Sequence, residues 1–172
     1  MTSVFIEGVY PMNNKTKTFV RAALFAAITA VATMVIAIPL PGGGYANLGD
    51  AVVLLSAFFL PVPYAAVAAG LGTAMADVLL SYTLYAPATF VIKALMALCA
   101  GALARGKMGR VVAAIAAECI MVAGYFGFET ALYGVAGAVP ALAGNSVQGI
   151  VGAVAALILF HCLNPILNRK EK

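Results

Sequence analysis

Residues 21–38 read RAALFAAITAVATMVIAI, a largely apolar run in which Arg21 is the single charged side chain. A helix needs roughly 20 mostly apolar residues to cross a hydrocarbon core of about 30 Å, so this run can span a bilayer. Further apolar runs follow at residues 50–60, 64–82, 88–104, 110–128 and 139–167. The pattern predicts an all-α fold, an integral membrane bundle of six transmembrane helices with a short second helix.

Composition supports the same fold class. Hydrophobic residues make up 64% of the chain and charged residues 9%, and the mean hydropathy is +1.04. A soluble domain normally carries about 25% charged residues. So few charged side chains cannot cover the surface of an aqueous fold, and most of the surface must therefore face lipid.

The basic residues indicate the topology. Nine of the ten lie in three short clusters beside the apolar runs, where Lys and Arg stay on the cytoplasmic side. With six spans and a cytoplasmic N-terminus, all three clusters fall inside, whereas five spans would put two of them outside. We therefore expect both termini in the cytoplasm of a prokaryotic cell, a location in the cell membrane, and no nucleic-acid partner for the net charge of +4. The clusters are Lys15, Lys17 and Arg21; Arg105, Lys107 and Arg110; and Arg169, Lys170 and Lys172.

The two ends of the chain differ from its middle. Residues 1–14 have no basic segment ahead of an apolar stretch, so they do not form a signal peptide. We expect residues 1–14 to be a loose cytoplasmic tail and residues 15–172 to form one transmembrane domain. In this topology the outer loops are residues 39–49, 83–87 and 129–139, none of which carries Lys or Arg.

Three charged residues lie inside the predicted spans: Asp77, Lys93 and Glu118. A charge at mid-bilayer costs about 2.5–3.5 kcal/mol on insertion scales, so such residues face a partner or a wet cavity. Asp77 and Lys93 lie near the outer ends of consecutive helices and so at similar depth. They either form a buried pair or contact a ligand.

A second polar group lies at the outer ends of the last two runs. Glu129 ends one helix, and Asn145 and Gln148 share one face of the next because they are three residues apart. Side-chain amides carry donors and acceptors together, which suits the edge of a heteroaromatic ring, and Tyr125 can stack on such a ring. The alternative is hydrogen bonding between helices.

No pattern in the chain indicates an enzyme, a cofactor or a metal site. His161 is the sole histidine, and it has no acidic residue close to it in the sequence. Residues 101–107 match the start of a phosphate-binding loop, but Met108 replaces the required Ser or Thr and no strand precedes the segment. We therefore expect a protein with no ATPase of its own.

Small residues form a stripe on the first helix at Ala22, Ala26 and Ala30, with Ala23 and Ala27 beside them. Small residues four apart let helix backbones approach closely. The stripe serves either internal packing or the docking of another membrane protein.

Several segments, in this order, resemble the S components of energy-coupling factor (ECF) vitamin transporters. The nearest are the riboflavin-type and the hydroxymethylpyrimidine/pyridoxine-type S components. The resemblance covers roughly residues 15–168. It implies a six-helix subunit that binds a vitamin near the outer face, beneath the loop between the first two helices. It also implies a transmembrane coupling protein and two cytoplasmic ATPases as partners. The segments are GYANLGD (44–50), YAPATFVIKAL (85–95), Glu118, GYF (124–126), Glu129 and NSVQG (145–149).

The combined interpretation is a subunit that captures a small, vitamin-like heteroaromatic compound. The excess of acidic over basic candidate residues favours a neutral or weakly basic compound over a polyanion. Asn47 and Asp50 either contact the substrate or cap the second helix. The rival functions are a proton-coupled carrier that uses Glu118 or Asp77, and a membrane scaffold without a ligand. The candidate substrate residues are Asn47, Asp50, Tyr85, Lys93, Tyr125, Glu129, Asn145 and Gln148, and the candidate docking residues are Ala22, Ala23, Ala26 and Ala27.

Overall fold

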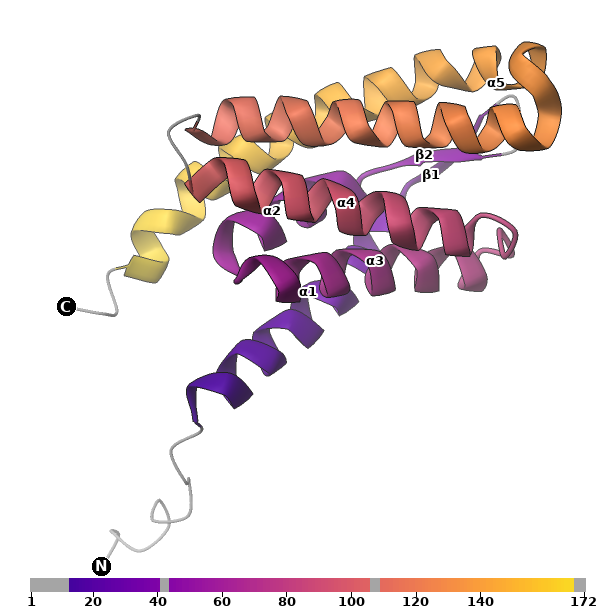
Figure 1. Cartoon of the computed structure of the whole chain (residues 1–172). Coiled ribbons are helices and arrows are strands. Elements are labelled where there is room, and N and C mark those ends of the chain that lie inside the picture. The colour runs from indigo at the N-terminus through magenta and orange to yellow at the C-terminus, as the bar shows by residue number, and fades with distance from the viewer. Residues whose placement is uncertain (1–12, 41–43, 106–108, 169–172) are drawn as a thin grey trace, which may run out of the picture.

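The computed structural model describes residues 13–40, 44–105 and 109–168 (Figure 1). These residues form five helices and one two-stranded ribbon. The cluster residues Lys107, Arg169, Lys170 and Lys172 and the predicted tail up to residue 12 lie outside the described residues. The helices are α1 (Asn14–Val35), α2 (Gly49–Phe59), α3 (Val62–Leu79), α4 (Ala86–Arg105) and α5 (Gly109–Asn168).

α1 begins well before the apolar run that predicted it. Asn13 is the N-cap, and its side-chain oxygen accepts a hydrogen bond from the backbone N of Lys15 at 2.6 Å. This cap satisfies one of the amides left free in the first helical turn, so the helix includes the mainly polar residues 14–18 as well as Phe19 and Val20. The apolar run marks the part suited to lipid, whereas the cap sets where the helix starts.

The sequence predicted a loop after α1, but the structure has two short strands there. β1 (Ala37–Pro39) pairs antiparallel with β2 (Tyr45–Asn47), with Ile38 opposite Ala46. The first span was expected to reach residue 38, and this was wrong because α1 ends at Val35 and a short strand follows. The all-α fold class holds. Each strand has three residues, which is too short for an alternation of polar and apolar side chains to be recognised in the sequence.

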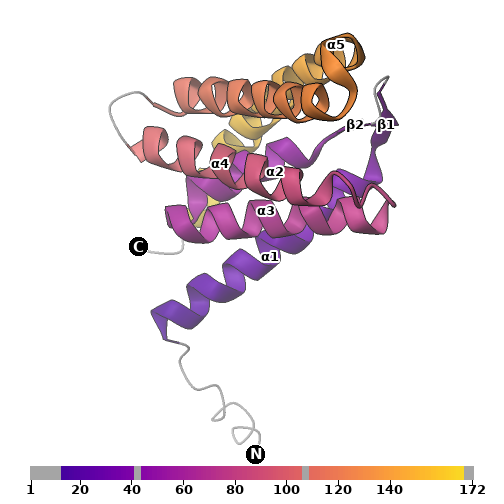
Figure 2. The same ribbon diagram turned by 45° about the vertical axis from the view of Figure 1, so that its right-hand side comes forward.

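The expected fifth and sixth helices are continuous in the structure and form one element, α5, with a kink. Gly134 interrupts it with φ 73° and ψ 167°, a conformation that glycine adopts because it lacks a Cβ atom. The chain reverses there, and the two limbs of α5 run side by side in both views (Figures 1 and 2). Within the described residues the count is therefore five rather than the six expected. Pro140 does not mark the break, because it lies inside the second limb.

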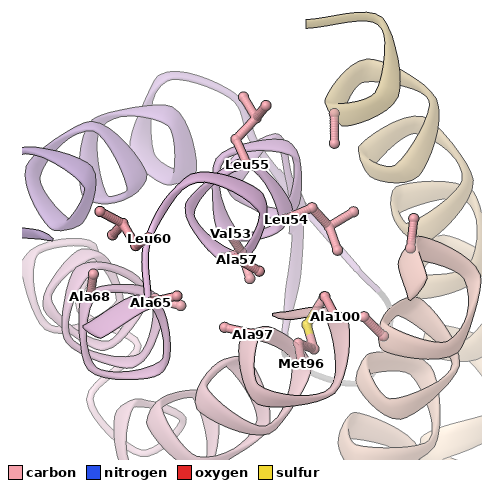
Figure 3. Packing of buried hydrophobic residues seen from close by; sticks show 14 of the residues in the cluster. Val53, Leu54, Leu55, Ala57, Leu60, Ala65, Ala68, Met96, Ala97 and Ala100 are labelled. Atoms are coloured by element: carbon pink, nitrogen blue, oxygen red, sulfur yellow. The ribbon is translucent and has the colours of Figure 1, made fainter. Parts of the chain in front are cut away.

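The short helix α2 lies at the centre of the packing. It contacts all four other helices, and Val53, Leu54 and Ala57 on it are fully buried. Figure 3 shows these side chains facing small residues of the neighbouring helices, such as Ala65 of α3 and Ala97 of α4. Small side chains on the longer helices thus make room for α2 inside the bundle.

α1 and α3 approach to backbone contact. An ideal Cβ atom placed on Gly72 would lie 2.4 Å from the carbonyl oxygen of Ala26. Ala22 and Ala30, on the same stripe of α1, are buried. Part of the small-residue stripe therefore serves internal packing.

The outer surface of the bundle is apolar. Large exposed side chains cover α1, α3, α4 and α5, for example Leu24, Leu71, Val91 and Ile150. Among the described residues, α1, α3, α4 and the 58-residue stretch Gly109–Ile166 of α5 are long and apolar enough to cross a membrane, while α2 is shorter. These features are those of a multi-pass membrane protein.

Candidate functional site

A small polar cavity lies beneath the β1–β2 ribbon. Its volume is about 20 Å³, and residues from the ribbon and from α1, α3, α4 and α5 line it. Six of the eight candidate substrate residues are among these lining residues, whereas Asp50 and Gln148 stand behind them. The lining residues are Thr33, Gly44, Tyr45, Asn47, Thr73, Asp77, Tyr85, Thr89, Lys93, Tyr125, Glu129 and Asn145.

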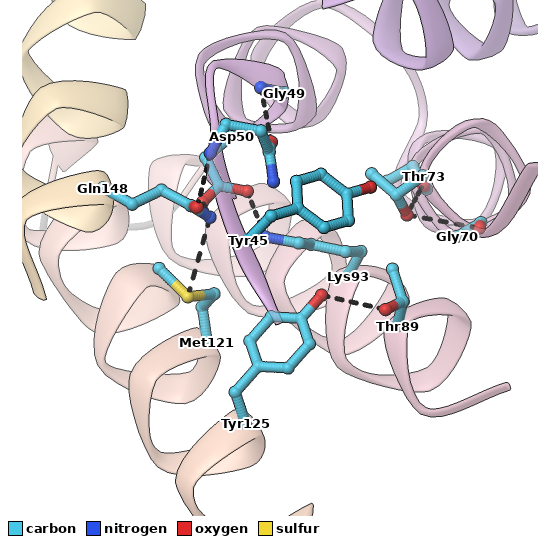
Figure 4. A network of polar contacts seen from close by, with 12 residues as sticks. Tyr45, Gly49, Asp50, Gly70, Thr73, Thr89, Lys93, Met121, Tyr125 and Gln148 are labelled. Atoms are coloured by element: carbon cyan, nitrogen blue, oxygen red, sulfur yellow. Dashed lines mark hydrogen bonds and ion pairs between the residues drawn. The ribbon is translucent and has the colours of Figure 1, made fainter. Parts of the chain in front are cut away.

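Lys93 is held by Asp50. The ammonium group of Lys93 on α4 forms a salt bridge with Asp50 Oδ1 on α2, and both side chains are completely or almost completely buried (Figure 4). The sequence had paired Lys93 with Asp77 as one possibility. Its partner is instead Asp50, because α2 enters the centre of the bundle and brings its first turn to the depth of Lys93.

Gln148 connects this ion pair to the ribbon. Its Nε2 donates to Asp50 Oδ2 at 2.6 Å, and its Oε1 accepts from the backbone N of Asn47 at 2.8 Å. The Asn47 side chain accepts from the backbone N of Gly49 at 2.8 Å. Asn47 therefore stabilises the start of α2, which is one of the two roles that the sequence had left open for it.

Tyr45 places its side chain inside the cavity. Its hydroxyl donates to Asp77 Oδ1 at 2.6 Å, and its ring packs on Tyr82 with centroids 4.6 Å apart. Burial, followed by the hydrogen bond to Asp77, raises the pKa of Tyr45, so the hydroxyl keeps its proton and remains a donor. Tyr45 was not among the candidate site residues, although it lies in the segment 44–50 that carried the resemblance.

Tyr85 and Glu129 form the opposite wall. Burial, a hydrogen bond with Tyr133 and the charge of Glu129 raise the pKa of Tyr85, and its ring meets Phe128 edge-on at 5.2 Å. An ideal Cβ atom on Gly44 would lie 3.2 Å from Glu129 Oε1. The ribbon therefore closes directly over Glu129, and a larger residue at position 44 would push the two apart.

Aromatic and hydroxyl groups complete the lining. Tyr125 donates its hydroxyl hydrogen to Thr89 Oγ1 at 3.0 Å, and the ammonium of Lys93 lies 5.4 Å from the centre of the Tyr125 ring. The threonines Thr33, Thr73 and Thr89 were missed by sequence reasoning, because a lone Thr in an apolar helix also occurs as a packing residue. Asn145 is buried, with 5% of its surface exposed.

Two residues discussed from the sequence lie elsewhere. Glu118 is buried, but it lines a separate apolar groove between the two limbs of α5 rather than the polar cavity. His161 is exposed and follows Phe160 near the end of α5. The part of the chain that the structure describes contains no cluster of three or more His, Cys, Asp or Glu side chains suited to a metal ion.

The candidate docking residues lie along one edge of α1. Ala22, Ala23 and Ala26 line an apolar groove of about 380 Å³ between α1 and α3, together with Val67 and Leu71 of α3. Ala22 also packs into the core, whereas Ala23 is exposed. Ala27 is outside this groove.

The ion pair generates a stability prediction. We expect Lys93→Met to lower the free energy of unfolding by about 3–5 kcal/mol, because it leaves the Asp50 carboxylate buried without its cation. The double variant Lys93→Met/Asp50→Asn should be more stable than Lys93→Met, because the amide that replaces the carboxylate is neutral and can still accept from Gln148. Thermal unfolding of the purified chain in detergent measures both. A double variant no more stable than the single one would contradict the pairing.

Comparison with known proteins agrees with this architecture. The structure is similar to one reported as "Structure and mechanism of the S component of a bacterial ECF transporter", with a TM-score of 0.74 and 21% identity over 89% of this chain and 98% of the other. The chain is 34% identical to the "Uncharacterized protein in gap 3'region" of Pyrococcus woesei, over 80% of this chain and 97% of that protein. The family model described as "ECF-type riboflavin transporter, S component" matches residues 13–165. This chain therefore belongs to the ECF-type riboflavin transporter S component family, whose members are transport subunits and not enzymes.

Proposed function

We propose that this protein captures a small, vitamin-like heteroaromatic compound near the outer face of the membrane and delivers it to an ECF-type ABC importer. The observation that carries the proposal is the polar and aromatic cavity beneath the β1–β2 ribbon, inside an otherwise apolar bundle. Buried polar side chains are costly in a membrane protein and usually mark a substrate path. Family membership supports the transport role.

The cavity lining suits a flat ring with polar edges. Tyr85 and Tyr125 offer aromatic faces, and Asn145 offers an amide with donors and an acceptor. The positive charge of Lys93 is already matched by Asp50. A neutral or weakly basic compound therefore fits better than a polyanion.

Binding requires the ribbon to move. A cavity of about 20 Å³ holds little more than one water molecule, whereas ligand sites usually enclose about 300–1,000 Å³. The Tyr45 side chain fills part of the space, and it is held by its bond to Asp77 and its contact with Tyr82. We propose that the ribbon, with Tyr45, swings away to admit the compound and then closes over it.

The proposal includes six spans with both termini in the cytoplasm. The two limbs of α5 count as the last two spans, and the described members of the first two basic clusters then lie on one side of the membrane. The ribbon and the turn before α4 lie on the other side, where the compound is captured.

The apolar groove between α1 and α3 is the proposed docking site of the transmembrane coupling protein, which carries the two ATPases. Its small residues allow a partner helix to approach closely. Ala23 and Ala26 face this groove without filling it. Ala22 packs inward and contributes to both the core and the groove.

The first prediction from this proposal concerns binding. We expect Asn145→Ala to weaken binding by at least about tenfold, because an unmade buried hydrogen bond costs about 1–3 kcal/mol. Gln148→Ala should weaken binding as much, because it removes the hydrogen bonds that hold Asp50 and the Asn47 backbone behind the cavity. His161→Ala, on the same limb of α5 but away from the cavity, should change affinity less than about twofold. Native mass spectrometry identifies the compound that co-purifies, and titration calorimetry measures its affinity. Equal losses in all three variants would contradict the site.

The second prediction concerns docking. Ala23→Leu fills part of the groove, so we expect it to reduce uptake by cells that carry the whole transporter while leaving binding to the isolated chain unchanged. Ala102→Leu, an exposed position on α4, is the matched control and should leave uptake unchanged. Normal uptake by Ala23→Leu would place the docking face elsewhere.

The third prediction concerns topology. On a background without Cys99, Cys119 and Cys162, Ser81→Cys should react with a membrane-impermeant maleimide added to intact cells. Arg110→Cys should react only after the membrane is permeabilised, because it belongs to a cytoplasmic cluster. Reaction of Arg110→Cys from outside would contradict the orientation.

A further inference from the structure

Two carboxylates in the cavity each have an oxygen with no hydrogen bond. Asp77 Oδ2 and Glu129 Oε2 are buried and find no hydrogen-bond partner among residues 13–40, 44–105 and 109–168. Thr89 offers a hydrogen bond to the Asp77 carboxylate and Tyr85 offers one to that of Glu129, so each acid leaves a single oxygen open. Buried polar atoms in native proteins nearly always have partners, so two acceptors facing one cavity indicate a ligand that supplies donors.

The other oxygen of Asp77 shows what kind of group fits. Tyr45 donates an O–H to Asp77 Oδ1 from within the cavity, on a ring that packs against Tyr82. An aromatic group that carries a hydrogen-bond donor is therefore already accommodated at this carboxylate. When the ribbon opens, Tyr45 leaves with it, and Asp77 loses the hydrogen bond that Tyr45 donates.

The balance of buried charges also indicates a ligand that supplies hydrogen-bond donors. Asp50, Asp77, Glu118 and Glu129 are buried acidic residues, whereas Lys93 is the sole buried cation in the described part of the chain. Lys93 is paired with Asp50 and cannot also neutralise the two acids of the cavity wall. A carboxylate without a cation is unfavourable in a site shielded from water, so each wall acid either keeps its proton or meets a cation. A cationic ligand that reaches both acids supplies the second alternative.

The function proposed above leaves a neutral and a basic compound open; on that basis we infer that the captured compound is the basic one, bound as a nitrogen cation whose N–H groups donate to Asp77 and Glu129. An amidine-like or amino-substituted ring meets this description. Asp77 is then a specificity-determining residue of the site. Its carboxylate selects for charge as well as for shape, while Lys93 offers no free positive charge to an anion.

Three ring compounds of nearly the same shape test the inference: benzamidinium, benzamide and benzoate. Their affinities are measured by ligand-observed NMR on the full chain in lipid nanodiscs at neutral pH. We expect benzamidinium to bind at least about tenfold more tightly than benzamide, because hydrogen bonds between charged groups are the stronger ones. Benzoate should bind most weakly of the three.

Substitutions of the buried acids show which residues cause the preference for benzamidinium over benzamide. Asp77→Asn and Glu129→Gln keep the shape of the wall but remove its charge, so each should reduce the preference for benzamidinium at least about fivefold. Glu118→Gln removes a buried acid that does not line the cavity, and it should alter the preference less than about twofold. If one wall variant fails to fold, the other and the wild-type preference still decide. Equal binding of benzamidinium and benzamide, binding of none of the three, or an equal loss in Glu118→Gln would overturn the inference.

Riboflavin, a neutral compound named in the family description, separates this inference from the proposed function. If riboflavin binds and is weakened by Asn145→Ala, while benzamidinium binds no more tightly than benzamide, the capture function stands and the cation inference fails. If benzamidinium shows the expected preference and loses it in the wall variants, the inference stands whether or not riboflavin binds.

Discussion

The ion pair between Lys93 of α4 and Asp50 of α2 is the interaction on which the rest of the site depends. Neither side chain could remain charged alone inside a bundle surrounded by lipid, and together they hold the first turn of α2 at the centre of the molecule. Gln148 extends the pair to the second limb of α5 and to the backbone of Asn47. The position of the ribbon therefore follows from the position of the pair.

The same pair determines the charge of the cavity. Lys93 is paired with Asp50. Among the described residues there is no other buried cation for the two acids of the cavity wall, Asp77 and Glu129. Tyr45 closes the space by donating to Asp77 from the ribbon. The fold thus places an acidic wall and a covering ribbon at one cavity, and we propose that the ribbon moves.

Much of the fold could be predicted from local sequence, because the length of an apolar run decides whether a helix can cross a bilayer. The runs located α2, α3 and α4 closely, and the predicted loop at residues 129–139 contains the break at Gly134, although the rest of that loop is helical. The start of α1 and the ribbon were not predicted. The first depends on a cap formed by Asn13, and the second on a pairing between strands of three residues each.

What the sequence by itself determined is the class of the protein and the set of polar residues that must lie away from lipid. It could not decide which of these residues meet, since the choice of Asp50 over Asp77 as the partner of Lys93 depends on how deeply α2 enters the bundle. Tertiary structure alone made that choice, and it also brought Tyr45 to Asp77 and placed Gln148 behind the cavity. The physical reason is that burial cost is a property of one side chain, whereas pairing depends on the distance and orientation of two helices.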